Sequence, residues 1–512
     1  MRRFTAMAPG TCLKGKYARR TRQCGLTMTL FLVGASLAGC SDPPIPVGTV
    51  GHVQQYFGGI AADEPRAVLI GRDVLSAGGT AADAVVAMSL AMMVTRPDAA
   101  GPGGGGVCVV YSAKDNKAEV IEFMPHAART RPPAGQWIAT VPGGFRGLFA
   151  LSARYGALRW EQLVLPAENM ARFGTEMPRG LARTLASDGQ SLLGDPRARL
   201  SFADSSGKPH AEGTMFRQLD LAGLLGRIRS IGPGDLHSGP FARQYLDAVH
   251  AAGGWLTIDD LRDYRPVWRE TVEFKAGNHI LHLPSSPALG AVVAGRIWRD
   301  LGNSSRYTGA DGAEQAVMMA ESARQAHAAA LAPPTSGRGS AGALAIDRSG
   351  SAASCVLTMG RPFGSGRVMG DTGIIAVEPA SSASALLLAP SVLANKNLKM
   401  AYAAATSSDD RYAGEALATV YAHLLDGNRT LEEAMNAPRY APGGAAGQIV
   451  VESRIPPEVR AALSARGRAV TVTPSIGRVN IMHCPIGMLE RPDLCVVRTD
   501  PRGFGHAVNA EF

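Results

Sequence analysis

The sequence lacks the features that mark disordered, fibrous and coiled-coil proteins. It has no Gly-X-Y period, no Pro/Gly tract, no internal repeat and no heptad pattern, although 60 of its 512 residues are glycine and 33 are proline. Hydrophobic residues make up 46% of the chain and charged residues 19%. This apolar content is sufficient for a substantial core, so the composition excludes a wholly disordered or fibrous protein and predicts a loop-rich globular fold.

Acidic residues are absent from the first 39 positions, which hold seven basic residues. The whole chain has 52 Lys and Arg against 43 Asp and Glu, a formal charge of +9. Without the N-terminal segment, 45 basic residues face 43 acidic ones. The positive charge is therefore concentrated at the N-terminus, and it gives no reason to expect a nucleic-acid partner.

The N-terminal segment has the layout of an export signal. The apolar run 26–36 is too short to span a bilayer, but it matches the hydrophobic region of a secretory signal. It leads into Leu37-Ala38-Gly39-Cys40, which resembles the lipobox of bacterial lipoproteins. The resemblance implies a signal peptide over 1–39, a lipid on Cys40 and a tether over 40–57. Ser41, in place of an aspartate, implies that the anchored protein lies in the outer membrane and faces the periplasm. The alternatives are a plain signal peptide or an N-terminal anchor, and Met7 is an alternative start.

The cysteines of an exported chain meet an oxidising compartment, where disulfides form. Cys484 and Cys495 flank a turn-rich stretch and either close a short disulfide loop or stay apart. Cys108 and Cys355 each lie in a strand-like apolar run, so we expect them to be buried small hydrophobic side chains. The eleven histidines show no metal-ligand spacing. We expect no metal site and no cofactor.

Helical and strand patterns together predict an α+β or layered α/β fold. Helices are predicted at 64–77, 81–94, 160–173, 219–231, 240–252, 312–331 and 409–425, and strands at 107–111, 272–274, 280–283, 342–346 and 352–358. Asp347-Arg-Ser-Gly350 joins the last two strands, which is typical of a hairpin. The glycines at 101–106 precede a strand, whereas a nucleotide-binding loop follows one, so they indicate close backbone packing. The breaker-rich segment 332–339 is the best internal boundary.

Several ordered stretches resemble the gamma-glutamyltranspeptidase family. Gly78-Gly-Thr-Ala-Ala-Asp-Ala-Val-Val-Ala87 resembles that family's G-G-N-A-V-D-A-A-V-A. Pro362-Phe-Gly-Ser-Gly366, Asn436-Ala-Pro-Arg439 and Asp500-Pro-Arg502 also match in order. The chain is identified as a member of this family over residues 58–508. Membership implies the αββα four-layer sandwich of N-terminal-nucleophile hydrolases and a precursor that cuts itself, here into regions 58–339 and 340–512.

The resemblance places the catalytic nucleophile at Ser340. The family's small subunit begins T-T-H-x-S-V-V-D, and aligning V-V-D on Ala345-Ile-Asp347 puts Ser340 at the first threonine. Serine keeps the hydroxyl, and the α-amine freed by cleavage after Gly339 would act as the base. The family's second threonine, which contacts the nucleophile, falls on Thr358. The alternative is that Ser340 is a loop residue in a Gly/Ser-rich linker.

The positions expected to bind substrate differ from those of the family. Met124 replaces the arginine that holds the glutamate α-carboxylate, and Ser382 replaces the aspartate that holds its α-amino group. Asp409 and Asp410 replace the glycine pair of the oxyanion hole, or else they are first-turn helix residues favoured by the dipole. The sequence retains residues of the fold and loses residues of the pocket.

Three functions remain open at this point. The first is a self-processing amidohydrolase or acyltransferase that acts on a small amide or peptide other than a γ-glutamyl compound. The second is a gamma-glutamyltranspeptidase with ordinary specificity, and the third is a non-catalytic lipoprotein that serves as a binding or scaffold module. Loss of pocket residues favours the first or the third.

Overall fold

A computed structural model describes residues 58–285, 287–329, 339–379, 387–408, 411–426, 429–445 and 447–509. The chain divides into two units, Met1–Thr49 and Val50–Phe512, and all described residues belong to the second. Cys40, Ser382, Asp409 and Asp410 lie outside the described residues.

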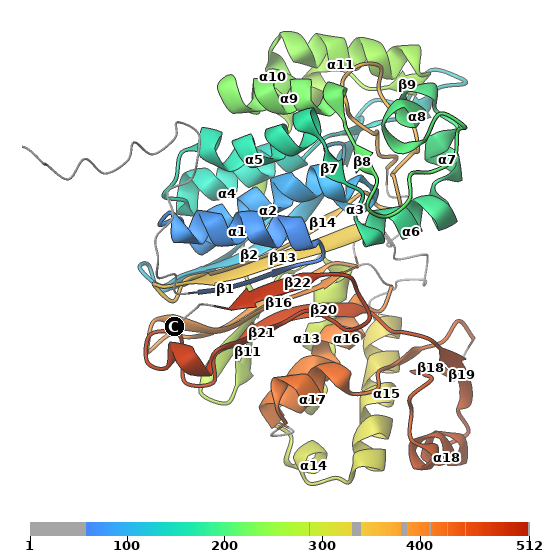
Figure 1. Ribbon diagram of the computed structural model, residues 1–512. Coiled ribbons are helices and arrows are strands. Elements are labelled where there is room, and N and C mark those ends of the chain that lie inside the picture. Colours follow the sequence, from blue (N-terminus) through green and yellow to red (C-terminus); the bar gives the residue numbers. More distant parts are fainter. Residues whose placement is uncertain are drawn as a thin grey trace, which may run out of the picture. The chain divides into compact units, whose positions relative to one another are not determined.

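Two antiparallel sheets form the centre of the described unit (Figure 1). The first has the strand order β10 (Val267–Glu270), β3 (Lys117–Glu122), β2 (Gly105–Ser112), β14 (Ala352–Thr358), β13 (Ser340–Asp347), β1 (Gly58–Ala62) and β22 (His506–Asn509). The second has the order β11 (Val272–Ala276), β12 (His279–Leu283), β15 (Ala389–Asn395), β16 (Met400–Ser408), β20 (Arg478–His483) and β21 (Val496–Arg498).

Smaller sheets lie at the periphery. One joins β17 (Tyr440–Pro442), β18 (Gln448–Glu452) and β19 (Ala469–Thr473). Short pairs join β4 (His126–Ala127) to β6 (Thr140–Val141), β5 (Trp137–Ile138) to β9 (Gly254–Trp255), and β7 (Thr175–Glu176) to β8 (Met215–Phe216).

Helices cover the outer face of each central sheet (Figure 1). Those that precede β10 in the sequence are α1 (Pro65–Ser76), α2 (Ala81–Thr95), α3 (Pro97–Ala100), α4 (Gly144–Tyr155), α5 (Trp160–Phe173), α6 (Arg179–Asp188), α7 (Gln190–Leu193), α8 (Pro196–Phe202), α9 (Leu219–Ser230), α10 (Asp235–Ser238), α11 (Pro240–Ala251) and α12 (Ile258–Asp263). Those that follow are α13 (Leu289–Leu301), α14 (Ser305–Thr308), α15 (Gly312–Ala329), α16 (Ala413–Tyr421), the π-helix η2 (Ala422–Asp426), α17 (Leu431–Asn436), α18 (Pro457–Ala465) and the 3₁₀-helix η3 (Pro492–Leu494).

The alternation of side chains along β13 shows why the layers form in this order. Ala341, Ala343 and Ala345 face one way and belong to the core shared with α2. Leu344 and Ile346 face the other way and pack into the core that lies between the two sheets. Both faces of β13 are buried. The αββα four-layer sandwich predicted from the sequence is confirmed.

Helix α2 is buried at every position, as its all-apolar sequence predicts. Thr80 caps its first turn, because the Thr80 side chain accepts a hydrogen bond from the backbone N–H of Asp83 and the Asp83 carboxylate accepts one from that of Thr80. The backbone N–H of Ala81 also donates to the Asp347 carboxylate at 2.8 Å, which ties the start of the helix to the end of β13.

The region around residue 410 differs from the sequence prediction. Ser407 and Ser408 are the last residues of β16 and do not cap a helix, and α16 begins only at Ala413. Asp409 and Asp410 are outside the described residues, so their interpretation as first-turn helix residues stays a prediction. The predicted helix also changes type, because its last turn, Ala422–Asp426, is a π-helix.

The cysteines form two disulfides within the described residues. Cys484 pairs with Cys495 across the turn-rich stretch. Cys108 pairs with Cys355, which lies directly opposite it in the β2–β14 ladder. Cys108 and Cys355 are fully buried, as expected. Their interpretation as small hydrophobic side chains did not predict that they form a disulfide. The sequence could not show that pairing, because it depends on the register of strands 247 residues apart.

A buried ion network joins the two C-terminal motifs singled out in the sequence. The Arg439 side chain is fully buried and donates from Nη2 to Oδ2 of Asp500 at 2.6 Å. Arg502 donates to Oδ1 of Asp500 at 3.2 Å and to Oε2 of Glu452 at 2.6 Å. The network therefore fixes the segment after β21 against the three-stranded sheet.

Within the described ranges, no helix has the length and apolarity needed to cross a membrane. Nor do those ranges contain a group of three or more His, Cys, Asp or Glu side chains placed to hold a metal ion.

Candidate active site

Ser340 begins β13, between β1 and β14 in the first sheet. The sequence pattern predicted that this strand would start at residue 342, which left Ser340 in a loop. In the structure Ser340 is paired with Thr358 in the β13–β14 ladder and is only 4% exposed. The two residues assigned to catalysis by resemblance are therefore opposite one another on neighbouring strands.

The carbonyl oxygen of Gly339 belongs to the peptide bond that precedes Ser340. It accepts a hydrogen bond from Oγ1 of Thr358 at 3.1 Å and another from the backbone N–H of Met359 at 2.9 Å. The Thr358 hydroxyl is itself oriented by the N–H of Gly360, which donates to it at 2.9 Å. Two donors on one carbonyl oxygen form the arrangement that stabilises negative charge when a nucleophile adds to the carbonyl carbon.

Gly339 has a backbone conformation that suits only glycine. Its φ is +93°, in a region that side chains strongly disfavour, and an added Cβ would lie 2.4 Å from the carbonyl carbon of Arg361. The close approach of the Arg361–Pro362 backbone thus fixes the peptide bond in front of Ser340.

Asp63 is a buried carboxylate close to Ser340 in the fold that sequence analysis missed. It follows β1, and its Oδ2 accepts from the N–H of Gly342 at 2.7 Å and from the hydroxyl of Ser408 at 2.6 Å. Its Oδ1 accepts from the side-chain amide of Asn480 at 2.8 Å. Asp63 therefore connects β13, which begins at Ser340, to strands β16 and β20 of the second sheet. A lone Asp after a short strand carries no motif that would have revealed this.

A cavity of about 240 Å³ opens beside Gly339. It is lined by more cations than anions, and its charged residues are Arg96, Arg183, Arg478, Arg502, Asp98 and Asp188. Most of its walls come from α3, α6 and the segment around Phe504. These residues are far apart in sequence, so no local pattern could have predicted the cavity.

The cations of this cavity are compensated to different degrees. Arg96 forms a buried two-point ion pair with Asp98, with N···O distances of 3.0 and 2.9 Å. Arg502 binds Glu452 and Asp500 in the network described above. Arg183 stacks its guanidinium on the Phe504 ring at 4.7 Å and forms no ion pair within the described residues. An anionic group entering the cavity would find Arg183 available as a partner.

Met124 is not part of this cavity. It lies after β3, is 6% exposed and belongs to the apolar core between the sheets. Its carbonyl oxygen accepts a hydrogen bond from the Tyr264 hydroxyl at 3.1 Å. The structure thus brings together Ser340 and Thr358 but leaves Met124 in the core, while Ser382, Asp409 and Asp410 are outside the described residues.

Comparisons with known proteins give one family and one shared fold. The family model of gamma-glutamyltranspeptidase matches residues 67–332, which end before Ser340. Over 285 residues the chain is 32% identical to glutathione hydrolase 3 of Arabidopsis thaliana, covering 53% of this chain and 45% of that protein. Over 327 residues it is 27% identical to the glutathione hydrolase proenzyme of Escherichia coli (strain K12), covering 59% and 56% of the two chains. The chain spans about half the length of the curated relatives it matches.

A solved structure resembles the chain over a longer range. The crystal structure of cephalosporin acylase from Bacillus halodurans superposes with a TM-score of 0.76 at 20% identity, covering 93% of this chain and 100% of that one. At this identity the likeness concerns the fold, and it extends over both regions that flank the Gly339–Ser340 bond.

Proposed function

Because the chain belongs to the gamma-glutamyltranspeptidase family, we propose that it is a self-processing amidohydrolase or acyltransferase with Ser340 as its nucleophile. The observation that carries this proposal is the pair of donors, Thr358 Oγ1 and Met359 N–H, on the carbonyl oxygen of Gly339. A β-ladder alone would supply the backbone donor. The added hydroxyl is the feature that suits chemistry at this carbonyl.

Self-processing would begin with the Ser340 hydroxyl attacking the carbonyl carbon of Gly339. The hydroxyl proton leaves, the C–O bond forms, and negative charge develops on the oxygen held by Thr358 and Met359. The C–N bond then breaks and the nitrogen takes a proton, which leaves an ester between Gly339 and the Ser340 side chain. Water hydrolyses this ester, so the products are a carboxylate at Gly339 and a free α-amine at Ser340.

The same serine would then act on substrate. Its new α-amine, in the neutral form, can accept the hydroxyl proton as the oxygen attacks an amide carbonyl. The departing amine takes that proton, and the acyl group remains on Ser340. Transfer to water completes hydrolysis, and transfer to an acceptor amine completes acyl transfer.

The charge of the cavity beside Gly339 indicates the class of acyl group. Arg183 can pair with a carboxylate on the acyl chain. Both carboxylates of the cavity already have partners, because Asp98 binds Arg96 and Asp188 accepts a hydrogen bond from the Ser187 hydroxyl. An ammonium group would therefore lose water without gaining a carboxylate partner comparable to the one the family provides. We propose an amide or peptide whose acyl group carries a carboxylate but no α-amine.

A matched pair of substrates tests this specificity. Glutaryl p-nitroanilide and γ-glutamyl p-nitroanilide differ only in the α-amine, and we expect the purified protein to hydrolyse the glutaryl compound with a higher kcat/KM. The γ-glutamyl ammonium leaves water without gaining a charge-assisted hydrogen bond, which would contribute about 1.5–3 kcal/mol. The expected ratio of the two kcat/KM values is therefore about ten to a hundred. Arg183→Gln should lower kcat/KM for both compounds and leave their ratio nearly unchanged, because both carry the carboxylate. Ser340→Ala gives the background. Faster turnover of the γ-glutamyl compound would indicate ordinary transpeptidase specificity.

We also propose that the mature protein is a lipoprotein anchored through Cys40 to the outer membrane. Several acyl chains, each contributing about 0.8 kcal/mol per buried CH₂, would hold it stably. Cys40→Ala should leave the precursor unprocessed or move the protein to the soluble periplasmic fraction, as judged by membrane fractionation. Ser41→Asp is the matched control, since it should keep the lipid and change only the membrane that retains the protein. A Cys40→Ala variant that fractionates like wild type would show that the lipobox interpretation is wrong.

A further inference from the structure

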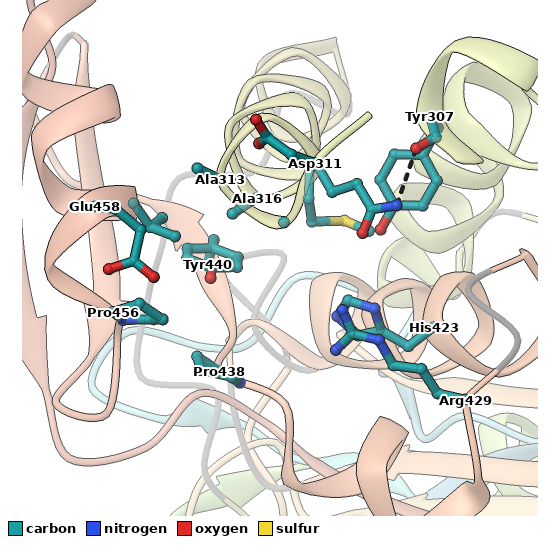
Figure 2. Close-up of a pocket in the computed structure, with 14 residues that line it drawn as sticks. Tyr307, Asp311, Ala313, Ala316, His423, Arg429, Pro438, Tyr440, Pro456 and Glu458 are labelled. Carbon is teal, nitrogen blue, oxygen red and sulfur yellow. Dashed lines mark hydrogen bonds between the residues drawn. The ribbon is translucent and has the colours of Figure 1, made fainter. Parts of the chain in front are cut away.

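A second cavity, of about 470 Å³, lies among α15, η2, β17 and α18 (Figure 2). It shares no lining residue with the cavity beside Gly339. Its size is within the range of small-molecule sites. Neither Ser340 nor any other residue of the proposed mechanism lines it, so the proposed function leaves this cavity without a role.

The π-helix η2 places a histidine in the cavity. His423 is the second residue of η2, lines the cavity and is 8% exposed. Its Nδ1 is buried and has no hydrogen-bond partner among the described residues. π-helical turns are rare and are often found at functional sites. An unpaired buried ring nitrogen in such a turn requires a partner that the described residues do not supply.

Arg429 lies beside His423 on the same side of the cavity (Figure 2). Its backbone N–H donates to the carbonyl oxygen of His423 at 3.3 Å, which keeps the two residues together. Among the described residues, no side chain forms an ion pair or hydrogen bond with the Arg429 guanidinium. The cavity thus offers a cationic fork and a neighbouring imidazole, both without partners in the part of the chain that the structure describes.

The His423 imidazole is neutral, so one of its two ring nitrogens carries a proton that it can donate. Burial lowers the pKa of His423 to about 4, and the nearby Arg429 and Arg439 add to this effect. The ring is therefore uncharged at neutral pH, and Arg429 supplies the positive charge at this end of the cavity.

The rest of the cavity is mainly apolar. Tyr440, Pro438, Met319 and Val459 line it, and these side chains suit a flat apolar group. Glu458 and Pro456 lie across from His423 and Arg429 (Figure 2). The acidic residues of the lining, Asp311 and Glu458, would repel a second anionic group. The polarity of the cavity therefore selects a molecule with one anionic end.

We propose that this cavity binds a small molecule composed of a carboxylate head and an aromatic or similarly flat apolar body. Arg429 holds the carboxylate through its guanidinium, and His423 donates a hydrogen bond to the same group. The apolar body lies against Tyr440 and the prolines.

Isothermal titration calorimetry on the purified full-length protein tests this proposal with 2-naphthylacetate as the probe. Its neutral isostere, 2-naphthylacetamide, has the same shape without the charge. A ligand of this size that binds with ordinary efficiency has a Kd of about 1 mM or lower. We expect wild type to bind the acetate at this level and to bind the acetamide about tenfold or more weakly.

Three variants localise the binding. Arg429→Gln should weaken binding of the acetate by about tenfold or more, whereas Arg460→Gln, an exposed arginine on α18, should leave it unchanged. Thermal melting of each variant verifies that it is folded. Ala316→Trp, which fills the cavity from α15, should remove binding of both probes.

The proposal is overturned if wild type does not bind the acetate in the millimolar range. It is also overturned if folded Arg429→Gln binds 2-naphthylacetate as tightly as wild type does, or if wild type binds 2-naphthylacetate and 2-naphthylacetamide equally. All of these measurements report binding and are independent of Ser340, so their failure would leave the proposed amidohydrolase function unaffected.

Discussion

Ser340→Ala should remain a single chain, whereas the wild-type protein should separate into residues 40–339 and 340–512. Alanine has no hydroxyl to attack the Gly339 carbonyl, so the acyl shift cannot begin. Intact mass spectrometry after reduction distinguishes the two outcomes directly. The Ser340→Ala variant should also lack amidohydrolase activity, because removing the nucleophile of a serine hydrolase lowers kcat by about 10⁶-fold.

Variants of Thr358 test the chemistry of this cut beyond the presence of the nucleophile. Thr358→Val keeps the size of the side chain but removes the hydroxyl that donates to Gly339, so processing should slow by about 10²–10³-fold. Thr358→Ser restores the hydroxyl and should recover most of the rate. Ser305→Ala, on the exposed face of α14, is the control for a serine outside the site.

Two results would contradict this account in different ways. If wild type stays uncut after prolonged incubation, the non-catalytic binding or scaffold function is the one that remains. If the Ser340→Ala variant is still cut after Gly339 at the wild-type rate, the nucleophile lies elsewhere.

Asp500→Ala should destabilise the fold more than any surface change. Arg439 is fully buried, and removing its carboxylate partner leaves an uncompensated charge inside the protein. Breaking a buried pair in this way costs about 3–5 kcal/mol of unfolding free energy. Urea unfolding followed by circular dichroism measures the loss. Asp493→Ala, which breaks the exposed pair with Arg491, is the matched control and should leave the unfolding curve nearly unchanged.

The pH dependence of this loss gives a second check. Burial alone would raise the pKa of Asp500, but Arg439 and Arg502 outweigh it and hold the pKa below its ordinary value of 3.8. A carboxyl group with a lowered folded-state pKa stabilises the fold above its unfolded pKa and loses that contribution as the pH falls. The stability difference between wild type and Asp500→Ala should therefore be full above about pH 4 and shrink below it. A difference that stays constant through this range would show that Asp500 does not act through its charge.

Much of the fold could be predicted from local pattern, because hydrophobic period and caps act over short distances. The predicted helix at 160–173 coincides with α5, and the hairpin of β13 and β14 follows from the turn at Asp347 to Gly350. Counting back from that turn pairs residue 340 with residue 358. The sequence therefore contained the Ser340–Thr358 contact, although the strand was predicted to start two residues late.

Other features depend on long-range register and could not be predicted. Asp63 accepts hydrogen bonds from Gly342, Ser408 and Asn480, which lie on three separate strands. Arg439 and Asp500 both belong to motifs that resemble the family, but no sequence pattern indicates that the two residues form an ion pair. The sequence pattern predicts an α-helix at His423, because the residues Ala-His-Leu-Leu-Asp of the π-helical turn have no pattern that distinguishes a π-helix from an α-helix.

The Cys108–Cys355 disulfide has a consequence for a protein that is cut after residue 339. One sulfur lies in the segment before the cut and the other in the segment after it, on adjacent central strands. Processing would therefore yield two polypeptides that stay covalently joined, and they would run as one band on a denaturing gel without reductant. Their separation would require reduction of a bond that is buried under α2, so Ser340 would stay with the other residues of the proposed site even if the two segments lost their noncovalent contacts.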